Sequence, residues 1–163
     1  GLLELIPRRG AFVRQPGPVE LLEMFEVMAE LEAVCGRLAA LRISDAALAE
    51  LREANSSCQT AVTAGDVEAY YSENERFHSI IYQQSGNSFL AQEAAKLHKR
   101  LQPFRRQQLR FRGRMGQSMS EHEQIVRALE VSKAEAAADA LRNHVAVQGE
   151  KFHQLMATLK NTA

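Results

Sequence analysis

The sequence predicts an all-α protein, an antiparallel bundle of about six helices preceded by a short β-hairpin. The chain has 163 residues, enough for one domain with a core, and only four of them are proline. From about residue 19 onward, apolar residues recur with the 3.6-residue period of a helix. Capping residues and glycines divide this region into helices of ordinary length.

Residues 1–14 are predicted to form the hairpin. Two short apolar runs, at residues 2–6 and 11–13, flank the turn sequence Pro7-Arg8-Arg9-Gly10. A lone hairpin is only marginally stable in water, so we expect it to be the remnant of a larger domain. The start at Gly1, without a methionine, fits a fragment or a processed product. Residues 15–19 contain two prolines around a glycine and are predicted to be a linker.

Three helices are predicted in the first half of the remaining chain. The first covers residues 19–41 and carries Phe25 and Cys35 on its apolar face. The second is capped by Ser44 and Asp45 and ends near residue 65, and the third runs from a cap at Asp66 to the Gly-Asn break at residues 86–87.

Three more helices are predicted in the second half. One covers residues 88–111 and ends before Gly113. The next covers residues 118–129, where Ser120 and Glu123 have the spacing of a capping box. Ser132 is predicted to cap the last helix. Residues 20–160 are therefore expected to form one helical domain.

Three histidines on three of these helices predict a metal site. His78, His122 and His144 each lie on the apolar face of their helix, and Asn74 lies one turn before His78 on the same face. Three neutral imidazoles and an amide oxygen suit a divalent ion, with Zn²⁺ expected and Ni²⁺ as the alternative. Such a site leaves positions open for water or an anion. The alternative is three core histidines, each hydrogen-bonded to a backbone carbonyl or a neighbouring side chain.

The other two histidines are predicted to point outward. His98 lies one position off the apolar face of its helix, and His153 lies on the side opposite His144.

A basic stretch from Lys96 to Arg114 contains eight bases and no acid, although the net charge of the chain is zero. Arg105 falls close to the inward face and could contact a carboxylate held by the metal, with Arg106 or Arg110 as the fallback. Tyr71 could add a hydroxyl to the same cavity. The alternative is a solvated basic face, with Tyr71 serving as a core residue.

Several segments together carry a family resemblance. They are Asn74-x-x-x-His78, the helix break Ser85-Gly86-Asn87, Glu121-His122-x-x-Ile125-x-x-Ala128-Leu129 and Leu141-Arg-Asn-His144. In this order and spacing, residues 20–158 resemble the FCD-type C-terminal ligand-binding domain of the FadR subfamily of GntR transcription regulators. Residues 5–13 resemble the wing that closes the N-terminal winged helix-turn-helix of that family.

The resemblance implies a homodimeric helical domain whose metal ligands would be Asn74, His78, His122 and His144. The family often has aspartate at the position of Asn74. It also often has an effector-binding arginine in the first helix, where this chain has Met28. The effector is therefore expected either to be less acidic than is usual for the family or to be anchored by Arg105.

The expected function is effector binding and dimerisation in a metabolite-responsive bacterial transcription regulator. A small organic acid would displace water on the metal, and the linker would pass the change to the DNA-binding domains. Arg8 and Arg9 of the wing would contact DNA phosphates, but operator binding would need the missing N-terminal domain. The protein is not expected to be an enzyme. The alternatives are a metal-dependent hydrolase or lyase and a plain helical dimerisation module.

The expected location is the cytoplasm, with no membrane contact. Cys35 and Cys58 give no disulfide framework, and no apolar run approaches the roughly 18 residues that span a bilayer. No signal peptide is visible.

Overall fold

The computed structural model describes the backbone of residues 3–6, 10–13 and 16–161, and side chains over residues 16–147. Its elements are β1 Leu3–Ile6, β2 Gly10–Val13, α1 Pro18–Ala40, α2 Asp45–Ala64, α3 Val67–Gln84, α4 Ser88–Leu109, α5 Arg114–Glu130 and α6 Ala134–Asn161. The predicted all-α bundle is confirmed.

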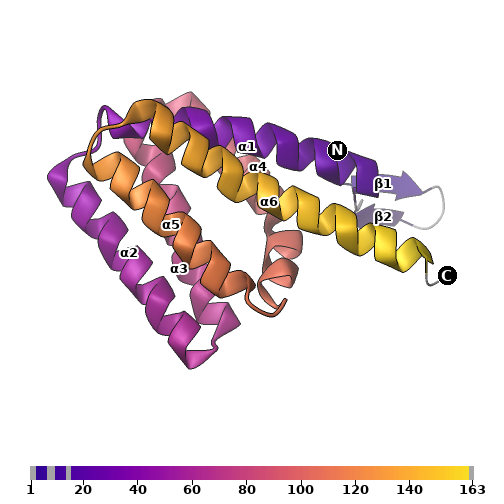
Figure 1. The fold of residues 1–163 in the computed structure, drawn as a ribbon. Coiled ribbons are helices and arrows are strands. Elements are labelled where there is room, and N and C mark those ends of the chain that lie inside the picture. The colour runs from indigo at the N-terminus through magenta and orange to yellow at the C-terminus, as the bar shows by residue number, and fades with distance from the viewer. Residues whose placement is uncertain (1–2, 7–9, 14–15, 162–163) are drawn as a thin grey trace.

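The longest helix pair of the bundle is α1 and α6, which lie side by side and run in opposite directions (Figure 1). Helix α2 packs on α3 and α5, and α4 packs on α1 and α3. The core of the described residues joins apolar side chains of the helices, including Phe25, Leu51, Phe77, Ile125 and Leu141. No described helix is both long and apolar enough to cross a bilayer.

The N-terminal strands pair antiparallel, with Leu3 opposite Val13 and Ile6 opposite Gly10. Arg8 and Arg9, predicted at the tip of this hairpin, lie outside the described residues. Helix α1 begins at Pro18, inside the segment predicted as linker, with Gly17 at its N-cap. Proline favours the first helical position because its fixed φ suits a helix and it has no N–H to leave unpaired there.

Helix ends in the first half of the bundle follow the predicted capping chemistry. The Ser44 hydroxyl accepts a hydrogen bond from the Ala47 N–H, and the Asp66 carboxylate accepts from the N–H groups of Glu68 and Ala69. Gly65 ends α2 in the left-handed conformation (φ 68°), which glycine adopts without steric cost.

Two predicted helix starts in the second half were wrong. Helix α5 begins at Arg114, so Ser120 and Glu123 lie inside it and form no capping box. Ser132 does not cap α6, because it has a φ of 52° and lies two residues before that helix begins. Instead, the backbone N–H of Lys133 donates to the Ala128 carbonyl and that of Ser132 to the Leu129 carbonyl. This is the Schellman pattern that ends a helix, and here it ends α5.

The close packing of α1 against α6 depends on Gly36, and this can be tested with a glycine pair. A Cβ at Gly36 would overlap the Leu141 side chain and lie 3.1 Å from the Ala137 carbonyl oxygen. We expect Gly36→Ala to lower the free energy of unfolding by about 1–3 kcal/mol through overpacking. Gly116→Ala, in an exposed part of α5 with nothing within 4 Å, should raise it by about 0.5–1 kcal/mol. Urea denaturation measures both values. Equal effects of the two substitutions would contradict this packing.

Candidate metal centre and adjoining cavity

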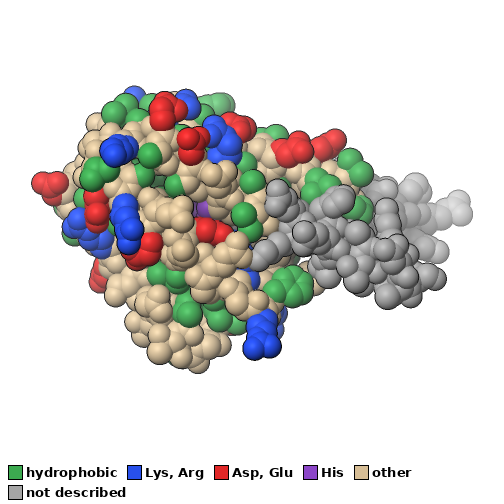
Figure 2. Space-filling model, in the orientation of Figure 1, with side chains coloured by type: hydrophobic (Ala, Val, Ile, Leu, Met, Phe, Trp, Pro, Cys, Tyr) green, Lys and Arg blue, Asp and Glu red, His purple; other side chains and the backbone are tan. Residues whose placement is uncertain are grey.

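Three helices bring His78, His122 and His144 to one point inside the bundle. They come from α3, α5 and α6, and all three side chains are buried. One potential ligand atom from each lies within 4.8 Å of the others. Only a small area of histidine is visible on the face shown in Figure 2. The candidate centre therefore lies inside the protein, where an unpaired imidazole is costly.

His78 is held by a buried carboxylate from α1. Its Nδ1 lies 2.9 Å from Oε2 of Glu32, and both side chains are fully buried. The other oxygen of this carboxylate, Oε1, accepts a hydrogen bond from Nη1 of Arg105 at 3.2 Å. This Glu32 triad consists of His78, Glu32 and Arg105, and it leaves Nε2 of His78 on the opposite side of the ring.

His144 is held in the same manner by a second carboxylate. Its Nδ1 lies 2.7 Å from Oε2 of Glu121, which also accepts a hydrogen bond from Nη2 of Arg114 at 2.9 Å. This Glu121 triad consists of His144, Glu121 and Arg114. In metal sites, a carboxylate on the distal nitrogen of a histidine fixes the tautomer and makes the ligating nitrogen more basic.

His122 has no such support. Its ring stacks on Phe77, with the ring centroids 4.1 Å apart and the planes at 8°. Neither of its ring nitrogens has a hydrogen-bond partner among the described residues, although the side chain is fully buried. A buried imidazole left in this way is destabilising unless a ligand takes up the nitrogen.

The electrostatic environment favours the neutral form of His122 and His144. Burial, together with the neighbouring His144 and His78, lowers the pKa of His122 well below its usual value. Burial and the proximity of His78 likewise lower the pKa of His144, although Glu32 opposes the change. Burial alone would raise the pKa of Glu32, but His78 and Arg105 outweigh it and hold the carboxyl ionised. Neutral imidazole is the form that binds a metal.

The three histidines thus fit a divalent ion by donor type and proximity. The unpartnered nitrogens of His122 are the most specific observation, because core packing alone gives them nothing to bind. The other two imidazoles face carboxylates through Nδ1, so Nε2 is the nitrogen of each that would bind an ion. His₃ sets of this kind suit Zn²⁺ and related ions.

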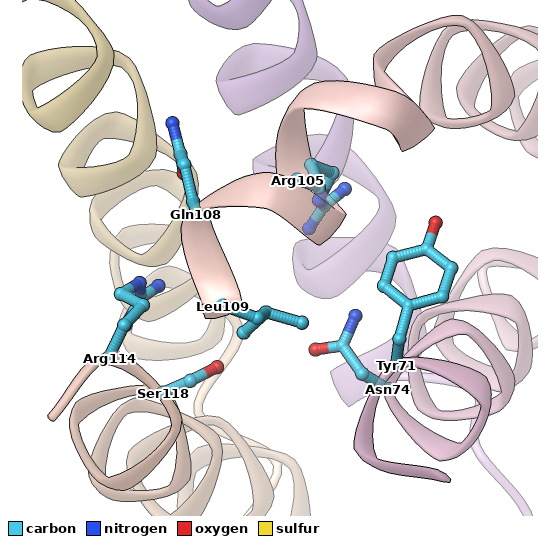
Figure 3. Close-up of a pocket in the computed structure, with 7 residues that line it drawn as sticks. All are labelled: Tyr71, Asn74, Arg105, Gln108, Leu109, Arg114 and Ser118. Carbon is cyan, nitrogen blue, oxygen red and sulfur yellow. The ribbon is translucent and has the colours of Figure 1, made fainter. Parts of the chain in front are cut away.

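A small cavity lies beside His78, because Arg105 both lines the cavity and contacts that histidine (Figure 3). The space in it that a water-sized molecule can occupy is about 10 Å³, so a larger ligand would enter only as the lining side chains move apart. Its lining residues are Tyr71, Asn74, Arg105, Gln108, Leu109, Arg114 and Ser118. Asn74 lies one turn before His78 and is 4 % exposed, so it faces this cavity from α3. Burial raises the pKa of Tyr71 to about 12, so its phenol stays protonated and can donate a hydrogen bond.

Arg105 lies between the cavity and the histidines. It is 3 % exposed, and its Nη2 lies 3.5 Å from Nε2 of His78. The two exposed arginines of α4 named as fallback anchors lie elsewhere. Arg106 and Arg110 both pair with Glu68, and Arg106 also covers the ring of Tyr71 at 5.1 Å. Arg105 is therefore the arginine of α4 that reaches the interior.

The prediction that His98 points outward was wrong. It is 3 % exposed, and its Nδ1 lies 2.8 Å from Nη1 of Arg105 and 3.0 Å from the hydroxyl of Tyr82. Because an arginine can only donate, Nδ1 of His98 accepts and the proton lies on Nε2. A position one step off an apolar face can still be buried where helices pack on two sides. His153 lies among residues whose side chains are not described.

Three charged residues of the site were not predicted from the sequence to belong to it. Glu32 appears there as an acid on an amphipathic helix, and Arg114 as one of several bases. Glu121 appears there only as the residue before His122 in the family pattern, whereas in the structure it contacts His144. A charged residue on an apolar face is the one signal that could have identified Glu32. Met28, at the position where the family often has arginine, is fully buried in the core.

Comparison with known proteins gives one family match and several structural neighbours. A model described as FCD domain matches residues 23–147. No curated protein matches the sequence. The structure of E. coli McbR/YncC has a TM-score of 0.83 at 22% identity, covering 95% of this chain and 74% of that chain. The structure of Streptococcus agalactiae GntR has a TM-score of 0.68 at 22% identity, and the match covers 90% of this chain and 74% of that chain. The structure of a GntR family member from Pseudomonas syringae pv. tomato str. DC3000 has a TM-score of 0.69 at 20% identity, and the match covers 99% of this chain and 67% of that chain.

The buried Glu32 carboxylate should stabilise the fold far more than an exposed acid on the same helix. Glu32→Gln leaves Arg105 buried without its counter-charge, and we expect it to lower the free energy of unfolding by about 3–5 kcal/mol. Glu30→Gln, two positions earlier, removes an exposed pair with Arg142 and should change stability little. Chemical denaturation of the metal-free proteins tests this. A loss in Glu32→Gln no larger than that in Glu30→Gln would contradict it.

Acid should destabilise the metal-free protein. The pKa values of His98, His122 and His144 are all lowered in the folded state, chiefly by burial, so the unfolded chain binds protons first as pH falls. Each histidine should reduce the free energy of unfolding by about 1.4 kcal/mol per pH unit below its unfolded pKa of about 6.5. Urea melts of chelator-treated protein between about pH 7.5 and 5.5 measure the slope. His122→Gln should reduce the slope of the free energy of unfolding against pH by the contribution of about one proton. A stability that does not depend on pH would contradict the prediction.

Proposed function

This chain belongs to the FCD domain family, and we propose that it is the effector-binding and dimerisation domain of a metabolite-responsive bacterial transcription regulator. Its effector would be a small organic acid, bound in a metal-centred pocket. The observation that carries this proposal is the cluster of three buried histidines beside a cavity lined by buried arginines. The fold shared with GntR-type regulators supports it.

The metal would be held by His78, His122 and His144, with Asn74 as the proposed oxygen ligand and Zn²⁺ or Ni²⁺ as the ion. The buried, unpartnered nitrogens of His122 support this assignment. When bound, a divalent ion would offer open positions that a carboxylate oxygen can occupy. The carboxylates of Glu32 and Glu121 would orient the imidazoles of His78 and His144 through their Nδ1 atoms.

Arg105 would recognise the acid. Its guanidinium lies against His78 and lines the cavity, so it could donate hydrogen bonds to a carboxylate that sits next to the metal. Tyr71, which lines the cavity from α3, would add a hydroxyl donor. Two conformations with different affinity for the acid are required for a switch. The contact of Arg105 with Glu32 provides one element that an incoming acid would alter.

The signal would reach DNA through the N-terminal end of the chain. Helix α1 carries Glu32 and begins at Pro18, close behind the β1–β2 hairpin (Figure 1). In the full-length dimer this hairpin would be the wing of the DNA-binding domain, with Arg8 and Arg9 at the phosphates. The regulator would act in the cytoplasm.

An enzyme is the weaker candidate. Hydrolysis or lyase chemistry at a metal needs a general base beside it. The two carboxylates next to the histidines, buried Glu32 and partly buried Glu121, are each paired with a histidine and an arginine, so neither is placed as a free base. Nothing in the described cavity favours catalysis over binding.

Acid binding should depend on both the metal and Arg105. We expect short carboxylic acids such as acetate and lactate to raise the melting temperature of metal-loaded protein but not of chelator-treated protein. Arg105→Gln should weaken acid binding by about 10- to 100-fold through loss of a charged donor, measured by calorimetric titration. Arg110→Gln provides the control: this arginine is exposed and pairs with Glu68, and the variant should bind as the wild type does. Equal binding by all three proteins would argue against this pocket.

A further inference from the structure

A second buried arginine lines the cavity and is not used by the proposed acid site. Arg114 lies at the start of α5 and is 2 % exposed. Its Nη2 donates to Glu121, but its Nη1 is buried and has no hydrogen-bond partner among the described residues. Buried guanidinium groups without a full set of acceptors are costly, so this one is ready to accept an anionic partner.

Arg105 and Arg114 reach the cavity from different helices. Figure 3 shows Arg105 on α4 and Arg114 at the beginning of α5, and both line the cavity. Arg105 touches His78, whereas Arg114 is joined through Glu121 to His144. The two guanidinium groups therefore belong to different contact networks, one at His78 and one at His144.

The charges around the cavity point to the same ligand. Arg105 and Glu32 cancel each other, as do Arg114 and Glu121. The two ion pairs at the cavity therefore carry no net charge. A divalent ion would add two positive charges inside the protein, and a buried charge is costly unless it is neutralised. A monoanion would cancel half of this charge and a dianion all of it.

We infer that the ligand of this cavity carries two acidic groups on a short carbon chain, one bound beside the histidines at Arg105 and the other at Arg114. This inference rests on the proposed function and makes it more specific, because it names a short dicarboxylate as the effector class. Arg114 is then a specificity-determining residue. It would distinguish a diacid from a monoacid of the same length.

The test compares diacids with their monoamides, which have the same length and shape but one charge fewer. Malonate, succinate and glutarate would each be titrated calorimetrically into the metal-loaded chain, next to malonamate, succinamate and glutaramate. We expect at least one diacid to bind about 10- to 100-fold more tightly than its monoamide, the range for a hydrogen bond to a charged group. This comparison uses wild-type protein and does not depend on how well a variant folds.

Arg114→Gln identifies the residue responsible. It should bring the affinity for the diacid down to that for the monoamide, while monoamide binding stays within about threefold of wild type. Arg112→Gln, an exposed arginine two positions earlier, should keep the preference for the diacid. Thermal melts and metal content would verify that both variants are folded and loaded.

Three results would overturn the inference. If the diacids and monoamides bind equally well, the second acidic group has no site, while the proposed acid pocket stands. A preference for the diacid that persists in Arg114→Gln would show that Arg114 does not determine this specificity. If no acid of either kind binds to metal-loaded protein, the proposed function fails and the inference fails with it.

Discussion

The fully buried carboxylate of Glu32 is the constraint on which the rest of the site depends. It lies on α1 and contacts His78 of α3 and Arg105 of α4, while the Tyr82 hydroxyl donates to it at 2.7 Å. A buried carboxylate is tolerated only where charges and donors surround it, so these contacts fix one another. In this way a single acid on an apolar helix determines the tautomer of a candidate metal ligand and the position of a candidate effector-binding arginine.

The second triad repeats this arrangement from the other side of the histidines. Glu121 joins His144 of α6 to Arg114 at the start of α5. Together the two triads connect five of the six helices, all except α2. A ligand that attracts either arginine would therefore disturb contacts that reach α1, the helix that follows the hairpin. Charged networks of this kind have discrete arrangements, which is what a ligand-controlled switch requires.

The sequence predicted the fold well because helical periodicity and capping residues are local signals. The all-α bundle, the caps at Ser44 and Asp66 and the FCD resemblance are confirmed. The role of Ser132 was wrong because a left-handed residue that ends one helix looks in sequence like a cap of the next. The start of α5 was wrong because Gly116 lies inside that helix and does not interrupt it. The inward histidines could be predicted from periodicity. The burial of His98, and the pairing of Glu32 with Arg105, depend on contacts across helices that periodicity along one helix does not encode.

The central claim is that the three buried histidines bind a metal ion. Elemental analysis of protein purified without a metal-affinity tag tests it most directly, alongside His122→Gln and the control His98→Gln, which alters a buried histidine outside the cluster. The account predicts a stoichiometric amount of zinc or nickel in the wild type and in His98→Gln, and its loss in His122→Gln. Absence of metal from the wild type, with no stabilisation by added Zn²⁺ or Ni²⁺, would contradict it and leave a helical domain with buried structural histidines.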